Sequence, residues 1–181
     1  MKKLLIVVDY QKDFVTGSLG FPGALALEDP IARKISEYKA AGDDILFTLD
    51  IHTKDYRATQ EGQRLPIVHC VAGTPGAKLY GKVGAACEPG MPCIEKPAFG
   101  SLALGDFLRE HPYQQVELVG LVSYICVLSN AVIAKAALPE ARIVIDAACT
   151  AGADAGLHEK ALDLLETLQV DVVNRRSPDV I

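Results

Sequence analysis

Short apolar runs rich in β-branched residues alternate along this chain with segments in which apolar residues recur at helical spacing. The apolar runs that we interpret as strands span residues 4–8, 45–49, 92–96, 116–121, 143–145 and 170–173. Continuous apolar runs of this length are typical of strands that are covered on both faces. Because a helix between two such strands makes a right-handed crossover, the alternation predicts a doubly wound, mainly parallel sheet in a three-layer α/β/α arrangement.

Capping residues indicate where the helices between these strands begin and end. Asp29-Pro30 supplies an N-cap and a first-turn proline, and the helical spacing that follows stops at Gly42. Ser101 and Asp154 are the expected N-caps of two later helices. Another helix follows Cys126. Each of these helices lies between two predicted strands, as the crossover connections require.

Composition limits the partners that we expect. The chain of 181 residues is 50% hydrophobic, so it suits one domain, residues 1–181, with a sizeable core. Its net charge of −5 comes from 23 acidic and 18 basic residues without a long block of one sign, which argues against nucleic acid as a partner. The apolar start, Met1–Asp9, lacks the cleavage site of a signal peptide, and no apolar run is long enough to cross a bilayer. We therefore expect no membrane association.

The five cysteines do not form the pattern of a disulfide framework or a zinc knuckle. They are odd in number and unevenly spaced, and no C-x-x-C pair occurs. A reducing compartment, the cytoplasm, is the setting that this usage predicts. Sheets of the expected type often associate through their helix faces, which leaves homo-oligomerisation open.

Reactive side chains follow several of the predicted strands. In doubly wound sheets, ligands bind beyond the carboxyl ends of the strands. The residues at those ends are Asp9, Asp50, His52, Lys96 and Cys126. Five reactive residues are thus predicted to meet at one rim of the sheet.

Three of these residues suit nucleophilic catalysis. Cys126 lies in the first turn between a strand and a helix, where unpaired N–H groups and the helix dipole lower the pKa of a thiol and can hold an oxyanion. Asp9 and Lys96 would supply a base for its proton and a positive charge that favours the thiolate. Taken singly, each has a structural alternative: a packed cysteine, a loop cap and a surface lysine. Their shared place at the rim favours catalysis.

A second group of residues suits a metal ion. Asp50 and His52 lie on the same side of an extended segment, so both can reach one ion, and His69 can complete a facial set. Glu61 is an unused carboxylate between the histidines, within the polar, irregular segment 53–83. Mixed carboxylate and imidazole ligands suit zinc, iron or manganese. The alternative is a pair of hydrogen-bonded structural histidines.

Five motifs in order resemble the isochorismatase-like cysteine hydrolases and, within them, the nicotinamidases. The motifs are Val8-Asp9-Tyr-Gln-Lys-Asp-Phe14, Asp50-Ile-His52, Leu65-Pro-Ile-Val-His69, Lys96-Pro-Ala-Phe-Gly-Ser101 and Gly120-Leu-Val-Ser-Tyr-Ile-Cys126-Val. The resemblance covers nearly the whole chain. It implies a six-stranded parallel sheet flanked by helices, a catalytic set of Asp9, Lys96 and Cys126, and a metal bound by Asp50, His52 and His69. Glu61 looks like the additional carboxylate ligand of some members.

The resemblance also implies finer features of the pocket. A cis peptide before the nucleophile turn maps onto Val122–Ser123, and the N–H groups of Ser123 and Cys126 would then face one oxyanion. Leu65 stands where nicotinamidases often have tryptophan, so contact with a substrate ring would rest on Phe14 and Phe99. The role of Tyr124 in the turn is not predicted.

The activity that this resemblance implies is hydrolysis of nicotinamide to nicotinate and ammonia through a cysteine thioester, with one divalent transition metal ion, zinc first and iron or manganese next. Nicotinamide is then the expected small-molecule partner. The first alternative is another C–N hydrolase of the same superfamily, acting on a non-pyridine amide or ureido substrate. A more distant alternative is a non-catalytic module that binds a metal or a small molecule on a doubly wound sheet.

Overall fold

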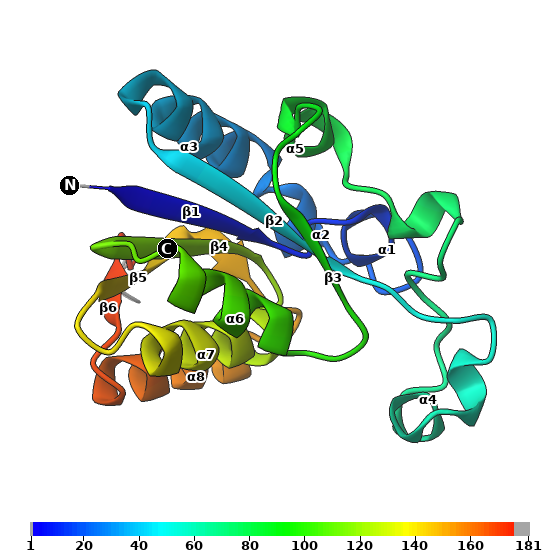
Figure 1. The fold of residues 1–181 in the computed structure, drawn as a ribbon. Helices are drawn as coiled ribbons and strands as arrows, with labels where there is room; N and C mark the ends of the chain where they lie inside the picture. The colour runs from blue at the N-terminus through cyan, green and yellow to red at the C-terminus, as the bar shows by residue number, and fades with distance from the viewer. Residues whose placement is uncertain (1, 176–181) are drawn as a thin grey trace.

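The computed structural model describes residues 2–175 and contains one six-stranded sheet between two layers of helices (Figure 1). The strand order is β3-β2-β1-β4-β5-β6, and every neighbouring pair is parallel. Strands β1, β2 and β3 follow one another toward one edge of the sheet. After β3 the chain returns to the other side of β1, where β4, β5 and β6 follow one another toward the opposite edge. The structure confirms the predicted doubly wound α/β fold.

The six strands lie where the apolar runs predict them. Their bounds are β1 Lys3–Val8, β2 Asp44–Asp50, β3 Cys93–Lys96, β4 Gln115–Leu121, β5 Arg142–Ala151 and β6 Asp171–Val173. The largest difference is β5, which continues past Asp146 because its pairing with β4 resumes after a register shift between Leu118 and Gly120. The irregularity hides the second half of β5 from a search for continuous apolar residues.

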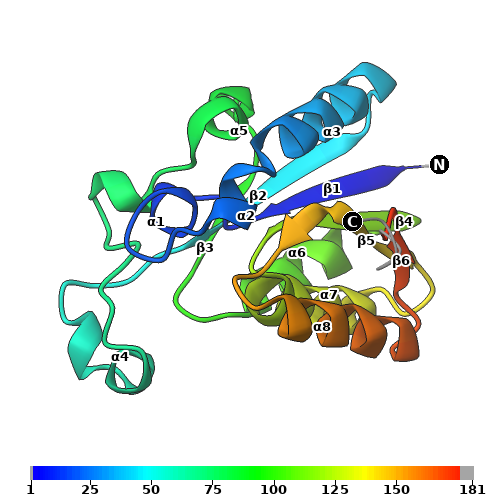
Figure 2. The same ribbon diagram turned by 180° about the vertical axis from the view of Figure 1, so that it is seen from behind.

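The longer helices divide between the two faces of the sheet. Helix α3 (Glu28–Ala41) covers one face, and α6 (Leu102–Glu110), α7 (Leu128–Ala137) and α8 (Ala155–Thr167) cover the other (Figures 1 and 2). Each layer has its own apolar core, with Ile31 and Ile35 of α3 in one and Leu104 and Leu165 in the other. Burying apolar surface on both faces explains why the strands are continuously apolar.

Helix caps follow the sequence with one exception. Gly42 ends α3 in the left-handed conformation at φ 71°, and Ser101 and Asp154 accept hydrogen bonds from the first turns of α6 and α8. Asp29 is not the N-cap of α3, because this helix begins one residue earlier, at Glu28. Asp29 instead lies in the first turn, where its charge complements the helix dipole.

The segment between β2 and β3 leaves the sheet and forms short helical turns. These are Tyr56–Ala58, α4 (Gln60–Arg64), Pro75–Ala77 and α5 (Gly81–Ala86). Both views place α4 away from the sheet, on an arm beyond the ends of β2 and β3 (Figures 1 and 2). The arm begins where β2 ends, so its residues can line a site at the carboxyl edge of the sheet. Two further short helices, α1 (Lys12–Val15) and α2 (Pro22–Leu25), follow β1.

None of the helices within residues 2–175 combines the length and the apolar character that a membrane span requires.

A cluster of charged residues is buried between α3 and the sheet. Lys34 Nζ lies 2.7 Å from Glu117 Oε1 and 2.6 Å from Asp146 Oδ2, and the Tyr38 hydroxyl donates to Glu117 Oε2 at 2.7 Å. Burial alone would raise the pKa of Asp146, but the hydrogen bond and charge of Lys34 hold it below its ordinary value. One ammonium therefore serves as the counter-ion of two buried carboxylates.

We expect Lys34→Met to destabilise the protein by about 3–5 kcal/mol, because it leaves two buried carboxylates without their counter-ion. Urea unfolding at neutral pH measures the loss. Since the folded pKa of Asp146 is depressed, the difference from wild type should shrink as the pH falls through that pKa. Lys82→Met is the matched control, because the Lys82–Asp29 pair is 65% and 75% exposed and solvent screening leaves it little effect on stability. Equal losses in the two variants would contradict the role of the buried cluster.

Candidate active site

Cys126 lies in a wide helical turn, Ser123–Val127, between β4 and α7. The carbonyl oxygen of Val122 accepts hydrogen bonds from the N–H groups of Ile125 at 3.0 Å and Val127 at 3.2 Å. The second is an i to i+5 bond, the mark of a π-type turn, which is frequent at functional sites. The Cys126 thiol is thereby placed at the start of α7, at the carboxyl edge of the sheet.

Gly120 allows β4 to run close beside β1 at this point. Its φ of 110° is unfavourable for other residues, and a Cβ atom here would collide with the backbone of Val8. Val8 precedes Asp9, so the close approach brings the strand ends that carry the carboxylate and the thiol side by side. Glycine is required here for both conformation and space.

Three predicted residues, Asp9, Lys96 and Cys126, converge at the rim. Lys96 Nζ lies 2.6 Å from Asp9 Oδ2 and 3.5 Å from Cys126 Sγ. The three side chains come from the ends of β1 and β3 and from the nucleophile turn, and each residue is at most 5% exposed. A base, a cation and a nucleophile thus share one buried site.

The electrostatics of this set differ from the expectation for its thiol. Burial, with the added charge of Asp9, raises the pKa of Cys126 well above its ordinary value and outweighs the opposing charge of Lys96. Our expectation of a lowered thiol pKa is therefore wrong for the resting site. Burial also raises the pKa of Asp9, against the influence of Lys96. A neutral thiol beside a carboxylate of increased basicity suits proton transfer from Cys126 to Asp9.

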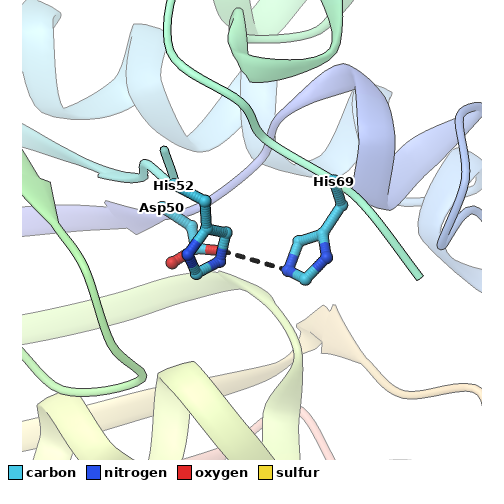
Figure 3. A group of neighbouring side chains, drawn as sticks. All are labelled: Asp50, His52 and His69. Atoms are coloured by element: carbon cyan, nitrogen blue, oxygen red, sulfur yellow. Dashed lines mark ion pairs between the residues drawn. The ribbon is translucent and has the colours of Figure 1, made fainter. Parts of the chain in front are cut away.

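Asp50, His52 and His69 form a compact cluster beside this set (Figure 3). Each offers a donor atom, and these atoms all lie within 4.8 Å of one another. Asp50 Oδ2 is 2.9 Å from His52 Nε2 and 3.4 Å from His69 Nε2, while Asp50 Oδ1 is 3.5 Å from Lys96 Nζ. Asp50 therefore joins the two predicted groups through its two oxygens.

His69 has the hydrogen bonding that orients a metal ligand, and His52 Nε2 is buried beside it. His69 Nδ1 lies 2.8 Å from the carbonyl of Ile67, which directs the Nε2 lone pair into the cluster. His52 Nε2 is buried, and although Asp50 Oδ2 lies 2.9 Å away, this atom makes no well-aligned hydrogen bond among the described residues. Glu61 Oε1 lies 3.7 Å and 3.8 Å from the two Nε2 atoms, so α4 brings a further carboxylate to the same point.

Backbone hydrogen bonds fix the two histidine segments to each other. The N–H of His52 donates to Cys70 O, and the N–H of Ala72 donates to His52 O, both at 2.9 Å. His52 and Val71 thus form a parallel bridge beside His69. The chain between the histidines therefore forms a loop whose two ends are joined by backbone hydrogen bonds just beyond the end of β2.

A pocket of about 230 Å³ opens onto Cys126 and the cluster. The predicted substrate contacts Phe14, Leu65 and Phe99 all line it, and so does Tyr124. The ring of Phe14 is 5.5 Å from that of His69. The walls are mainly apolar, so the pocket suits a small ring compound with its polar group at the inner end.

The cis peptide lies one residue earlier than predicted. It joins Leu121 to Val122, whereas we expect it between Val122 and Ser123 from the motif. Strand β4 ends at Leu121, so the cis bond falls where the chain leaves the sheet, and Val122 is already extended ahead of the turn. Ser123 and Cys126 remain together in the turn as predicted.

Three residues of the site were not predicted from the sequence. Thr48 donates its hydroxyl to Asp9 Oδ1 at 2.7 Å, Asn130 hydrogen-bonds to the carbonyl of Cys126, and His158 Nδ1 lies 2.9 Å from Ser123 Oγ. Thr48 occupies an ordinary strand position. His158 lies on a helix 35 residues after its partner Ser123, and Asn130 lies one helical turn after Cys126. Only the position of Asn130, four residues after Cys126, carried a usable signal.

Comparison with known proteins identifies the family of this chain. The model of the isochorismatase domain matches residues 3–177. The chain belongs to the isochorismatase family. This confirms the resemblance that the five motifs indicate.

Relatives within the family include nicotinamidases. An isochorismatase family protein of Bacillus subtilis (strain 168), described as uncharacterized, is 33% identical over 144 residues, which cover 73% of this chain and 78% of that protein. The nicotinamidase/pyrazinamidase of Mycobacterium tuberculosis is 29% identical and covers 94% of this chain and 98% of its own length. The crystal structure of a nicotinamidase/pyrazinamidase from Bacillus subtilis is 31% identical, with a TM-score of 0.83 over 95% of this chain and 99% of that one.

For this isochorismatase family member, we expect Thr48→Val to cost about 1.5–3 kcal/mol at neutral pH, because it removes a buried hydrogen bond to an ionised carboxylate. The bond lowers the pKa of Asp9, so the loss should decrease as the pH falls and Asp9 is protonated. Urea unfolding at neutral and acidic pH measures both values.

Thr150→Val is the matched control for this prediction. Its buried hydroxyl donates at 2.8 Å to a neutral acceptor, the carbonyl of Gly120, so its cost should not depend on pH. A pH-independent cost for Thr48→Val as well would contradict an ionised Asp9 at neutral pH.

Proposed function

We propose that this protein hydrolyses nicotinamide to nicotinate and ammonia through a thioester on Cys126. The observation that carries the proposal is the position of Lys96 Nζ, in contact with Asp9 and Cys126 on one side and 3.5 Å from Asp50 of the histidine cluster on the other. A nucleophilic set and a ligand set thus share one small apolar pocket. The relatives described as nicotinamidases support the choice of substrate.

In the first half of the reaction, Asp9 accepts the thiol proton while Cys126 Sγ forms a bond to the carboxamide carbon. The electron pair of the carbonyl moves to its oxygen, which the N–H groups of Ser123 and Cys126 would stabilise. When the oxyanion collapses, the C–N bond breaks and Asp9 returns the proton to the leaving ammonia. Lys96 keeps its positive charge throughout and stabilises the negative charge as it passes between oxygen, sulfur and Asp9.

In the second half, water cleaves the thioester. Asp9 accepts a proton from the water as its oxygen bonds to the acyl carbon, and collapse expels the sulfur of Cys126. The sulfur recovers the proton from Asp9, the remaining proton of the water passes from the acid product to solvent, and nicotinate leaves. The raised pKa of the buried Asp9 serves both halves, because the group must accept and return a proton in each.

The cluster of Asp50, His52 and His69 fits a divalent metal ion. The test is the buried His52 Nε2, which makes no well-aligned hydrogen bond within residues 2–175 and lies beside a carboxylate oxygen and a second imidazole. Glu61 would be an additional ligand from α4. A bound ion would supply a Lewis acid that holds the ring nitrogen of the substrate at this end of the pocket.

Zinc is the ion that we propose, ahead of iron and manganese. Two imidazoles with one or two carboxylates match the nitrogen and oxygen ligands of zinc sites, whereas calcium and magnesium prefer sites of oxygen alone. The buried site is also small, since its donor atoms lie within 4.8 Å of one another.

Ring contacts would come from Phe14, Leu65 and Phe99. Phe14 packs against His69, and Phe99 is 45% exposed at the pocket opening. Leu65 supplies an aliphatic surface, which tolerates variation in the ring more readily than a stacked aromatic pair would. Non-pyridine amides are therefore the proper comparison in an assay.

We expect Cys126→Ala to abolish ammonia release from nicotinamide while leaving the fold intact, because the nucleophile is lost and the alanine fills most of the same buried space. A coupled ammonia assay and circular dichroism measure the two properties. Cys149→Ala, which removes a buried thiol of β5 outside the pocket, should keep activity. Turnover in Cys126→Ala would rule out the thioester route, and turnover of other amides alone would replace nicotinamide as the substrate.

We expect a chelator to abolish turnover and zinc to restore it. His69→Ala should lower zinc affinity at least about tenfold, because a direct ligand is removed. Calorimetry and elemental analysis measure binding without reference to activity. The exposed His111, which contacts the carbonyl of its own helix, supplies the control variant His111→Ala with unchanged affinity. Equal zinc binding in the two variants would remove His69 from the site.

A further inference from the structure

Asn130 is a fully buried amide one helical turn after Cys126. Its side chain makes three hydrogen bonds to the backbone of two other segments. Nδ2 donates to Cys126 O at 2.8 Å and to Phe99 O at 3.1 Å, and Oδ1 accepts from the N–H of Ser101 at 3.0 Å. The two carbonyls require a donor and the N–H requires an acceptor, so only one orientation of the amide satisfies all three.

These bonds complete a closed ring of contacts around the reactive atoms. Lys96 Nζ donates to Ala98 O at 3.0 Å and lies 3.5 Å from Cys126 Sγ. Asn130 then connects the next residue, Phe99, back to Cys126. Two contacts therefore connect the segment after β3 with the turn that contains Cys126. One is made by the ammonium of Lys96 and the other by the amide of Asn130.

A buried amide at this position is costly unless it is fully hydrogen-bonded. The next four positions of α7, residues 131–134, are apolar, and Ala131 and Ala134 pack in the main core. An apolar residue would be the ordinary occupant of such a site. The amide instead hydrogen-bonds to backbone groups of the two segments that carry the ammonium and the thiol. Holding these two segments in alignment would explain why an amide occupies this position.

We propose that Asn130 is a positioning residue, which keeps the segment after Lys96 in register with the nucleophile turn and so maintains the contact between ammonium and sulfur. Asn130 does not touch the substrate pocket. It acts through the backbone of Phe99, which lines the pocket, and through the carbonyl of Cys126. The catalytic part of this inference rests on the proposed function.

The test compares Asn130→Ala and the isosteric Asn130→Asp with wild type in the full-length protein. Asn130→Ala removes all three bonds, and Asn130→Asp replaces the two donors by an acceptor. We expect kcat for nicotinamide to fall at least tenfold while KM changes less than threefold, because the reacting groups and not the pocket contacts lose their alignment. Thermal unfolding shows how much stability is lost, and all rates are measured well below the melting temperature.

A second readout does not depend on the substrate. Iodoacetamide modification of Cys126, followed by peptide mass spectrometry, should be at least fivefold slower at neutral pH in both variants, with its pH profile displaced upward. The sulfur loses the fixed ammonium that favours its ionised form. Should wild type fail to hydrolyse nicotinamide, this result would still support the positioning role and only the proposed function would fall.

Tyr38→Phe is the control for lost stability. Tyr38 makes a buried hydrogen bond to Glu117 on the far face of the sheet, so its loss should lower stability and leave kcat and alkylation within twofold. If the Asn130 variants also lose only stability, Asn130 is a structural residue and the proposal is wrong. If Asn130→Asp does not fold, Asn130→Ala carries the same test with the same outcomes.

Discussion

The site depends on one buried ammonium. Lys96 is 1% exposed, and its Nζ lies 2.6 Å from Asp9, 3.5 Å from Asp50 and 3.5 Å from Cys126. Two carboxylates could not both stay ionised at this depth without it, because desolvation disfavours each charge. The same charge also links the nucleophilic set to the imidazole cluster. The chemistry proposed at the sulfur and the metal binding proposed at the histidines would therefore depend on the same buried charge.

The fold brings these groups together through the order of its strands. Strands β3, β2, β1 and β4 are adjacent and parallel, so Lys96, Asp50, Asp9 and the turn after Leu121 emerge at one edge. The register aligns Asp50 with Lys96 and Val8 with both Thr48 and Gly120. Side chains that are distant in sequence become neighbours because their strands end at the same level, which is the general reason that such sheets bind ligands there.

Much of this arrangement could be predicted from the sequence, and the failures have physical causes. The strands, the rim residues and the Asp50, His52 and His69 cluster follow from local apolar runs and from residues at their ends. The second half of β5 was missed because a register shift interrupts its pattern, and the cis bond was placed one residue late. The pKa of Cys126 was predicted in the wrong direction, because burial outweighs the helix dipole and Lys96, and burial is a tertiary property. Thr48 acts through a side-chain contact with a residue 39 positions away, which no local pattern encodes, whereas the spacing of Asn130 from Cys126 gave a local signal for only one of its three contacts.

The backbone bridge between His52 and Val71 makes the position of the imidazoles independent of the shape of the pocket wall. The imidazoles lie beside this bridge, at the two ends of the loop, whereas Glu61 and Leu65 lie within the loop itself. Substitutions or length changes within residues 53–68 can reshape the wall that faces a ligand and leave the anchored imidazoles undisturbed. Selection for new ring compounds could thus act on this arm alone, and relatives with divergent arms could keep the same chemistry at the rim.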